Sequence, residues 1–199
     1  WTMTDLLTEP LPTMWEGRAI DPDFRHMVRL LNGIHRAESD EERAQLYCEA
    51  IQHFFVEPVS PEALPEAFSS LVRFCQGGAD EAPQKQTEAS SGGSSEPLFD
   101  YHCDAAYFIG SFQQAYGIDL TVDRVHWWRF QALLRSLPCD TALGRILDFR
   151  GADTSEMDEA HRKYYEAMKE RYALPPDLKG VKRVETLQEH EAAFIDRFG

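Results

Sequence analysis

Three adjacent residues, His102, Cys103 and Asp104, carry the imidazole, thiol and carboxylate groups that most often bind metal ions. Successive residues of a helix point about 100° apart, so these neighbours diverge and cannot converge on one ion. The remaining histidines are scattered singly, and the sequence lacks the motifs G-x-G-x-x-G, G-K-[ST], H-E-x-x-H and G-x-S-x-G. We therefore expect no catalytic, metal-binding or cofactor-binding residues and no enzyme.

Two aromatic segments remain as candidates for protein binding. The run His-Trp-Trp-Arg-Phe at 126–130 and the pair at 164–165 contain residue types that dominate protein interfaces, but the same types fill helical cores. Adjacent tryptophans on a helix diverge, so one is expected beside the N-terminal helices and the other among the C-terminal helices. Core packing is the favoured interpretation and binding the alternative. The residues concerned are Trp127, Trp128, Arg129, Phe130, Tyr164 and Tyr165.

Helical periodicity predicts the elements that position these residues. In the N-terminal part, helices are expected after the start signals Asp21-Pro22-Asp23, in which Asp21 is the expected cap, Ser39 with Glu42, and Ser60-Pro61-Glu62. Further helices are expected over about 100–117, 121–137, 140–147, 157–172 and 184–198. The 121–137 helix is apolar on nearly all sides, and Asp140 is the expected cap of the 140–147 helix. The residues flanking Glu16-Gly17 predict a short hairpin. The predicted fold is an all-α bundle of about seven to eight helices with a short N-terminal β-hairpin.

Residues 77–97 are rich in Gly, Ser and acidic side chains and show no periodicity. We interpret them as a flexible linker between an N-terminal helical unit, 1–76, and a C-terminal helical unit, 98–199, that contains the Trp-Trp helix.

Composition restricts the classes of partner. The 199 residues are 43% hydrophobic, which is enough for a packed core, and carry a net charge of -14. This charge disfavours binding to nucleic acid or acidic membranes. The four cysteines are widely spaced, as expected for reduced thiols in the cytoplasm. No segment has the length and polarity of a membrane span or signal peptide.

Several short runs resemble the bacteriophage gene-product-fifteen family in order and spacing. They comprise Leu6–Pro12, Glu16-Gly17, Asp23–Arg25, Tyr116–Leu120, His126–Phe130, Ala132–Leu134, Asp140-Thr141, Phe149-Arg150, Lys163–Tyr165 and Tyr172–Pro175. The Trp-Trp motif is the most specific of them. The linker at 77–97 and the helix after Pro175 have no match in the family pattern.

The resemblance implies a phage tail assembly chaperone in the host bacterial cytoplasm. Such a chaperone would bind the tape-measure protein during tail morphogenesis, with the major tail protein as a further candidate partner. A structural virion protein, such as a tail-completion or connector subunit, is the alternative. A homo-oligomer remains open, and no catalytic residues are carried over from the family. The acidic charge and amphipathic helices are compatible with a chaperone for helical proteins.

Overall fold

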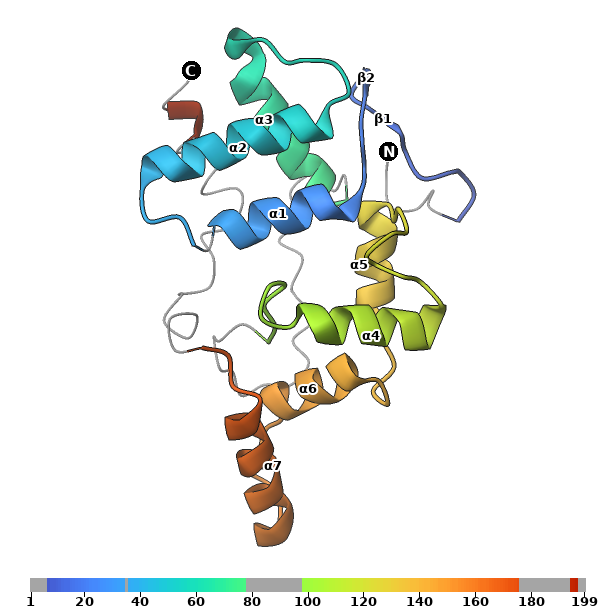
Figure 1. Cartoon of the computed structure of the whole chain (residues 1–199), viewed down its shortest axis with the longest axis vertical. Coiled ribbons are helices and arrows are strands. Elements are labelled where there is room, and N and C mark those ends of the chain that lie inside the picture. The colour runs from blue at the N-terminus through green and yellow to red at the C-terminus, as the bar shows by residue number, and fades with distance from the viewer. Residues whose placement is uncertain (1–6, 35, 78–97, 176–193, 197–199) are drawn as a thin grey trace. The chain divides into compact units, whose positions relative to one another are not determined.

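A computed structural model describes residues 7–34, 36–77, 98–175 and 194–196 (Figure 1). Over these residues the chain forms seven α-helices, one short 3-10 helix and one antiparallel β-hairpin, which confirms the predicted fold class. The elements are β1 (Met14–Trp15), β2 (Arg18–Ala19), α1 (Phe24–Ile34), α2 (Asp40–Phe54), η2 (Pro61–Ala63), α3 (Leu64–Cys75), α4 (Ala105–Tyr116), α5 (Trp127–Arg135), α6 (Ala142–Gly151) and α7 (Glu159–Arg171). The predicted linker beyond Gly77 and most of the predicted last helix lie outside the described residues.

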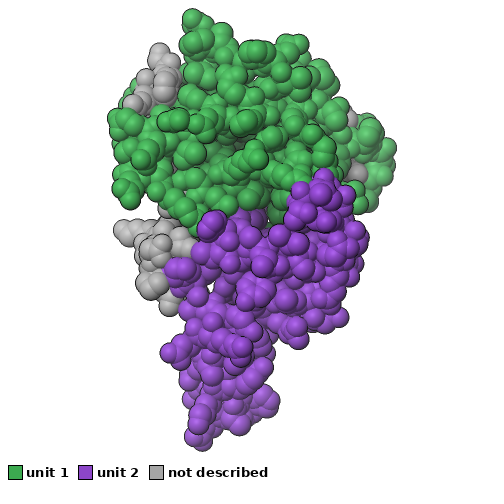
Figure 2. All heavy atoms as spheres, in the orientation of Figure 1, with its two compact units in different colours: residues 1–83, 124–134, 184–199 green, residues 84–123, 135–183 purple. Residues whose placement is uncertain are grey.

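Internal contacts divide the chain into two units, coloured separately in Figure 2. Unit 1 comprises residues 1–83, 124–134 and 184–199, and unit 2 comprises 84–123 and 135–183. The sequence placed the Trp-Trp helix in a unit spanning 98–199, whereas α5 is grouped with the N-terminal helices. The reason is chemical: the indole groups of α5 find hydrogen-bond acceptors on α3, far away in the sequence.

Local signals explain where most elements begin and end. The Ser39 hydroxyl accepts a hydrogen bond from the Glu42 backbone N–H and caps α2. Asp158 caps α7 by accepting from two backbone N–H groups. Gly117 ends α4 at φ 67°, a left-handed conformation that favours glycine. Glu16 and Gly17, at φ 47° and 81°, form the hairpin turn.

Several helix starts differ from the prediction. Helix α4 begins at Ala105 rather than near residue 100, and α5 begins at Trp127 rather than near residue 121. At two other helices a neighbouring residue provides the cap. Asp23 rather than Asp21 caps α1, because its carboxylate accepts from the Arg25 backbone N–H while Asp21 forms ion pairs. Thr141 rather than Asp140 caps α6, with its hydroxyl accepting from the Gly144 N–H. In both cases the true cap lies within two residues of the predicted one, because neighbouring oxygen-bearing side chains compete for the same role.

Aromatic packing dominates the core of unit 1. Phe54, Phe68 and Phe74 have 0% exposed area, and Met27 and Ile51 are buried with them. The rings of Phe54 and Phe74 lie 4.8 Å apart. Each ring buries a large apolar area, so these aromatic side chains contribute strongly to the hydrophobic stabilisation of this unit.

Unit 2 is organised by α4, α6 and one buried ion pair. Arg150 donates to both carboxylate oxygens of Asp104, at 2.7 and 3.0 Å, and the two side chains are only 10% and 3% exposed. The same guanidinium donates to the backbone oxygens of Leu98 and Tyr172. Arg150 therefore joins the start of the described unit 2 segment, the N-terminus of α4 and the end of α7.

Candidate protein-binding surfaces

Both tryptophans of the Trp-Trp motif are buried against the end of α3. Trp127 is 3% exposed and donates its indole N–H to the Cys75 oxygen at 3.1 Å. Trp128 is 6% exposed and donates to the Phe74 oxygen at 2.7 Å. The expectation that the two rings enter different helical units is wrong, because both use acceptors at the end of the same helix. These acceptors are carbonyls of the last turn of α3, which helical hydrogen bonds leave partly unsatisfied.

A third tryptophan uses the same helix. Trp15, next to the hairpin turn, donates its indole N–H to the Ser70 oxygen at 3.0 Å. Its ring lies edge-on to Phe74 and to Trp128, at centroid separations of 5.5 and 5.8 Å. No pattern in the sequence connects Trp15 with the Trp-Trp motif, because their contact depends on the path of the chain around α3.

The other four candidate residues lie in different environments. Phe130 is 1% exposed and stacks on Phe24, whereas Arg129 is on the exposed side of α5. Tyr165 is half-buried and donates to Asp148, whereas Tyr164 is 52% exposed. Of the six candidates, only Arg129 and Tyr164 are exposed to a partner.

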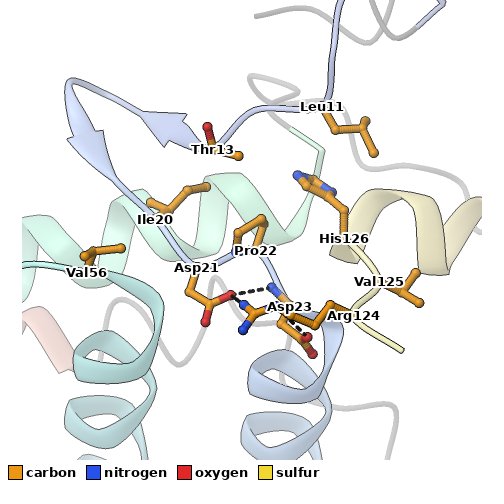
Figure 3. Close-up of a pocket in the computed structure, with 10 residues that line it drawn as sticks. All are labelled: Leu11, Thr13, Ile20, Asp21, Pro22, Asp23, Val56, Arg124, Val125 and His126. Carbon is orange, nitrogen blue, oxygen red and sulfur yellow. Dashed lines mark hydrogen bonds and ion pairs between the residues drawn. The ribbon is translucent and has the colours of Figure 1, made fainter. Parts of the chain in front are cut away.

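Unit 1 contains an open cavity that the sequence did not predict (Figure 3). Its volume is about 540 Å³. It is lined by Leu11, Thr13, Ile20, Asp21, Pro22, Asp23, Val56, Arg124, Val125 and His126. Val56 is 65% exposed, so an apolar side chain is presented to solvent at this cavity. Its lining residues come from irregular or extended segments, and for that reason helical periodicity gave no signal for them.

The acidic side chains at the cavity form ion pairs with neighbouring basic side chains of the same unit. Arg124 bonds the Asp21 carboxylate, and its Nε lies 3.7 Å from Asp23 (Figure 3). Burial raises the pKa of Asp21, but hydrogen bonds from Arg124 and His26 outweigh burial and lower it overall. Asp23 also pairs with Arg25 at 2.9 Å. These ion pairs join Asp21 and Asp23 to Arg124 and Arg25 at the cavity wall.

His126 has a fixed structural role at the edge of the cavity. Its Nδ1 accepts from the Trp128 backbone N–H at 3.1 Å, so the proton of the neutral ring is on Nε2, 3.1 Å from the Pro12 oxygen. Burial lowers the pKa of His126, although the bond to Pro12 opposes this shift. The imidazole is therefore held neutral, with both nitrogens occupied.

The exposed Tyr164 belongs to a helix that buries none of its residues. Helix α7 contacts α6 along one side, where Phe149 meets the rings of Tyr164, Tyr165 and Tyr172. On another side of α7, Ala160, Lys163, Ala167 and Arg171 are exposed. Tyr164 lies at the border of the two sides, since its ring contacts Phe149 while 52% of its area remains exposed. A helix with no buried residue gains little from tertiary packing, so this exposed side is a second candidate surface.

No metal-binding constellation accompanies these surfaces within the described ranges 7–34, 36–77, 98–175 and 194–196. Over those residues no three His, Cys, Asp or Glu side chains are placed to hold one ion. Asp104 is turned into the ion pair with Arg150, while His102 and Cys103 are exposed. The neighbours His102, Cys103 and Asp104 thus point to different surroundings.

Comparison with known proteins decides the family. Residues 7–174 match the family model described as Bacteriophage Gp15 protein. The chain belongs to this family. The match covers helices α1 to α7, and membership makes the chain a phage structural or morphogenesis protein.

Other comparisons add no relative. No curated protein and no solved structure matches this chain. Of the helices that the structure describes, none has the length and apolar character needed to cross a bilayer.

Proposed function

We propose that this protein is a tail assembly chaperone that binds the tape-measure protein during phage tail morphogenesis. The observation that carries the proposal is the family match over residues 7–174. Part of the proposal is that the protein acts by binding alone, without catalysis. In support, the charged residues Asp21, Asp23 and Arg124 at the unit 1 cavity form ion pairs, and His126 bonds a backbone oxygen.

The unit 1 cavity is the surface we propose for the client. Five of its lining residues are apolar, and Val56 among them is largely exposed. A cavity of about 540 Å³ accommodates one or two large apolar side chains of a helix or an extended segment. The net charge of -14 would keep a complex with an apolar client soluble.

Co-expression with the tape-measure gene of the same phage tests the proposal. We expect the wild-type protein to raise the soluble fraction of the tape-measure protein and to co-purify with it. Val56→Asp should weaken both effects at least tenfold, because it places a charge where an apolar side chain must dock. Val56 is 65% exposed, so this change should leave the fold intact.

Val122→Asp is the matched control. Val122 is 70% exposed but belongs to unit 2 and does not line the cavity, so client binding should persist. Failure of the wild-type protein to bind the tape-measure protein would favour the alternative function. If purified virions contain the protein in stoichiometric amounts and the tape-measure protein does not bind it, a structural virion subunit replaces the chaperone.

A further inference from the structure

We propose that the exposed side of α7 pairs with α7 of a second copy of this chain, as an antiparallel two-helix contact. The proposal concerns unit 2 alone and is independent of the client cavity in unit 1. It starts from four exposed positions, Ala160, Tyr164, Ala167 and Arg171, which are separated by four, three and four residues. This 4-3-4 spacing is that of the seam residues through which two helices pack together.

The helix is stabilised locally even though it buries nothing. Asp158 accepts from the Ala160 and His161 backbone N–H groups, and Lys169 and Arg171 lie in the last turn, where cations favour a helix. Arg162 donates to the backbone oxygens of Thr154, Ser155 and Met157 and holds the preceding loop to the helix. The seam is therefore presented on an ordered element.

Side-chain size makes the seam complementary to itself. In an antiparallel pair centred between residues 165 and 166, Tyr164 faces Ala167 of the second copy, and Arg171 faces Ala160. Each large side chain thus meets a small one, as efficient helix packing requires. A parallel pair would instead place Tyr164 opposite Tyr164 and Arg171 opposite Arg171. Two large side chains would then face each other in one layer, and the two guanidinium groups would repel each other.

The charges flanking the seam also favour the antiparallel pair. Lys163 and Glu170 lie on one flank of the seam and are both exposed. In the antiparallel pair, Lys163 of each copy comes beside Glu170 of the other, so the contact contains two opposite-charge pairs related by the twofold axis. Helix α7 carries four basic and three acidic residues, whereas the whole chain has a net charge of -14. Two α7 helices therefore approach each other with little of the repulsion that the rest of the chain generates.

The length of α7 sets the strength of the contact. Its 13 residues span about 20 Å, and one such pair buries less than the ~1,000 Å² typical of stable interfaces. We expect dissociation constants of about 10⁻⁵ to 10⁻⁴ M, so that dimer forms only as the protein concentration rises.

Charge-swapped variants of the full chain provide the test. We expect wild type to shift from monomer to dimer in sedimentation velocity between about 1 and 300 µM. Lys163→Glu and Glu170→Lys should each weaken dimerisation at least tenfold, because each converts both opposite-charge pairs into like-charge pairs. An equimolar mixture of the two variants should form a heterodimer, because the opposite-charge pairs are restored across the contact.

Arg145→Glu is the control for a change of charge alone. Arg145 is exposed on α6, outside the seam, so this variant should dimerise like wild type. Circular dichroism of each variant checks that α7 remains helical. A wild-type chain that stays monomeric throughout, single variants that dimerise normally, or a mixture that does not recover would each overturn the proposal. Client binding through Val56 would be unaffected by any of these outcomes.

Discussion

Replacing Trp128 with alanine is the strongest test of how the Trp-Trp motif is used. The side chain is 6% exposed, stacks on Phe74 at 5.1 Å and donates to the Phe74 oxygen. A buried tryptophan removes about 200 Å² from water, worth about 5 kcal/mol at about 25 cal/mol/Å², of which alanine retains about 1 kcal/mol. The lost hydrogen bond adds about 1 kcal/mol at most, because the Phe74 oxygen still accepts from Gly77. We therefore expect the free energy of unfolding to fall by about 3–5 kcal/mol.

Urea unfolding followed by tryptophan fluorescence and circular dichroism measures this loss. Trp128→Phe separates its components, since phenylalanine keeps much of the apolar contact and loses only the indole hydrogen bond and part of the ring. Its cost should be about 1–2 kcal/mol. Tyr164→Ala is the exposed aromatic control and should cost less than about 1 kcal/mol. If Trp128→Ala and Tyr164→Ala destabilise the protein equally, the assignment of Trp128 to the core is refuted.

Three further predictions, made with four substitutions, test other parts of the structure. Arg150→Met should lower stability by about 3–5 kcal/mol in thermal melts, because it strands the buried Asp104 carboxylate, and a loss below about 1 kcal/mol would contradict this reading. The pKa of His126 is lowered by burial, so the folded state binds fewer protons and stability should fall as pH drops below about 6.5. His126→Gln should flatten that slope in melts from pH 7 to 5, and an unchanged slope would count against it. Gly144→Ala should destabilise by about 1–3 kcal/mol, because its Cβ would lie 2.3 Å from a backbone oxygen, whereas Gly110→Ala, with open space, should stabilise by about 0.5–1 kcal/mol. Equal melting temperatures for the two alanine variants would argue against the clash.

Much of the fold was predictable because its signals are local. Ser39 caps α2, Gly117 stops α4 and the Glu16-Gly17 turn forms the hairpin, as their residue types predict. Hydrogen bonds of this kind join residues only a few positions apart, so the order of residues already contains the information.

The grouping of helices depended on long-range contacts that carry no local signal. The indole groups of Trp127 and Trp128 find acceptors 52 and 54 residues earlier in the chain. Composition predicts a boundary between two helical units at the Gly/Ser-rich stretch, but it does not indicate which helices pack together across that stretch. For the same reason the role of Trp15 was missed.

The candidate surfaces were predictable only in part. The tyrosine pair at 164–165 was identified from its residue types, but periodicity does not distinguish the exposed Tyr164 from the half-buried Tyr165. The cavity residues Leu11 and Val56 lie outside the helices, where an isolated apolar residue is not distinctive in sequence.

Site-specific photo-crosslinking from position 56 tests the chaperone proposal most directly. Benzoylphenylalanine would be incorporated at position 56, or at position 122 as the control, in cells that are assembling phage. Illumination and peptide mass spectrometry then identify the attached proteins. We expect cross-links to the tape-measure protein from position 56 and few from position 122. Cross-links from position 56 that contain no tape-measure peptides, or equal yields from both positions, would contradict it.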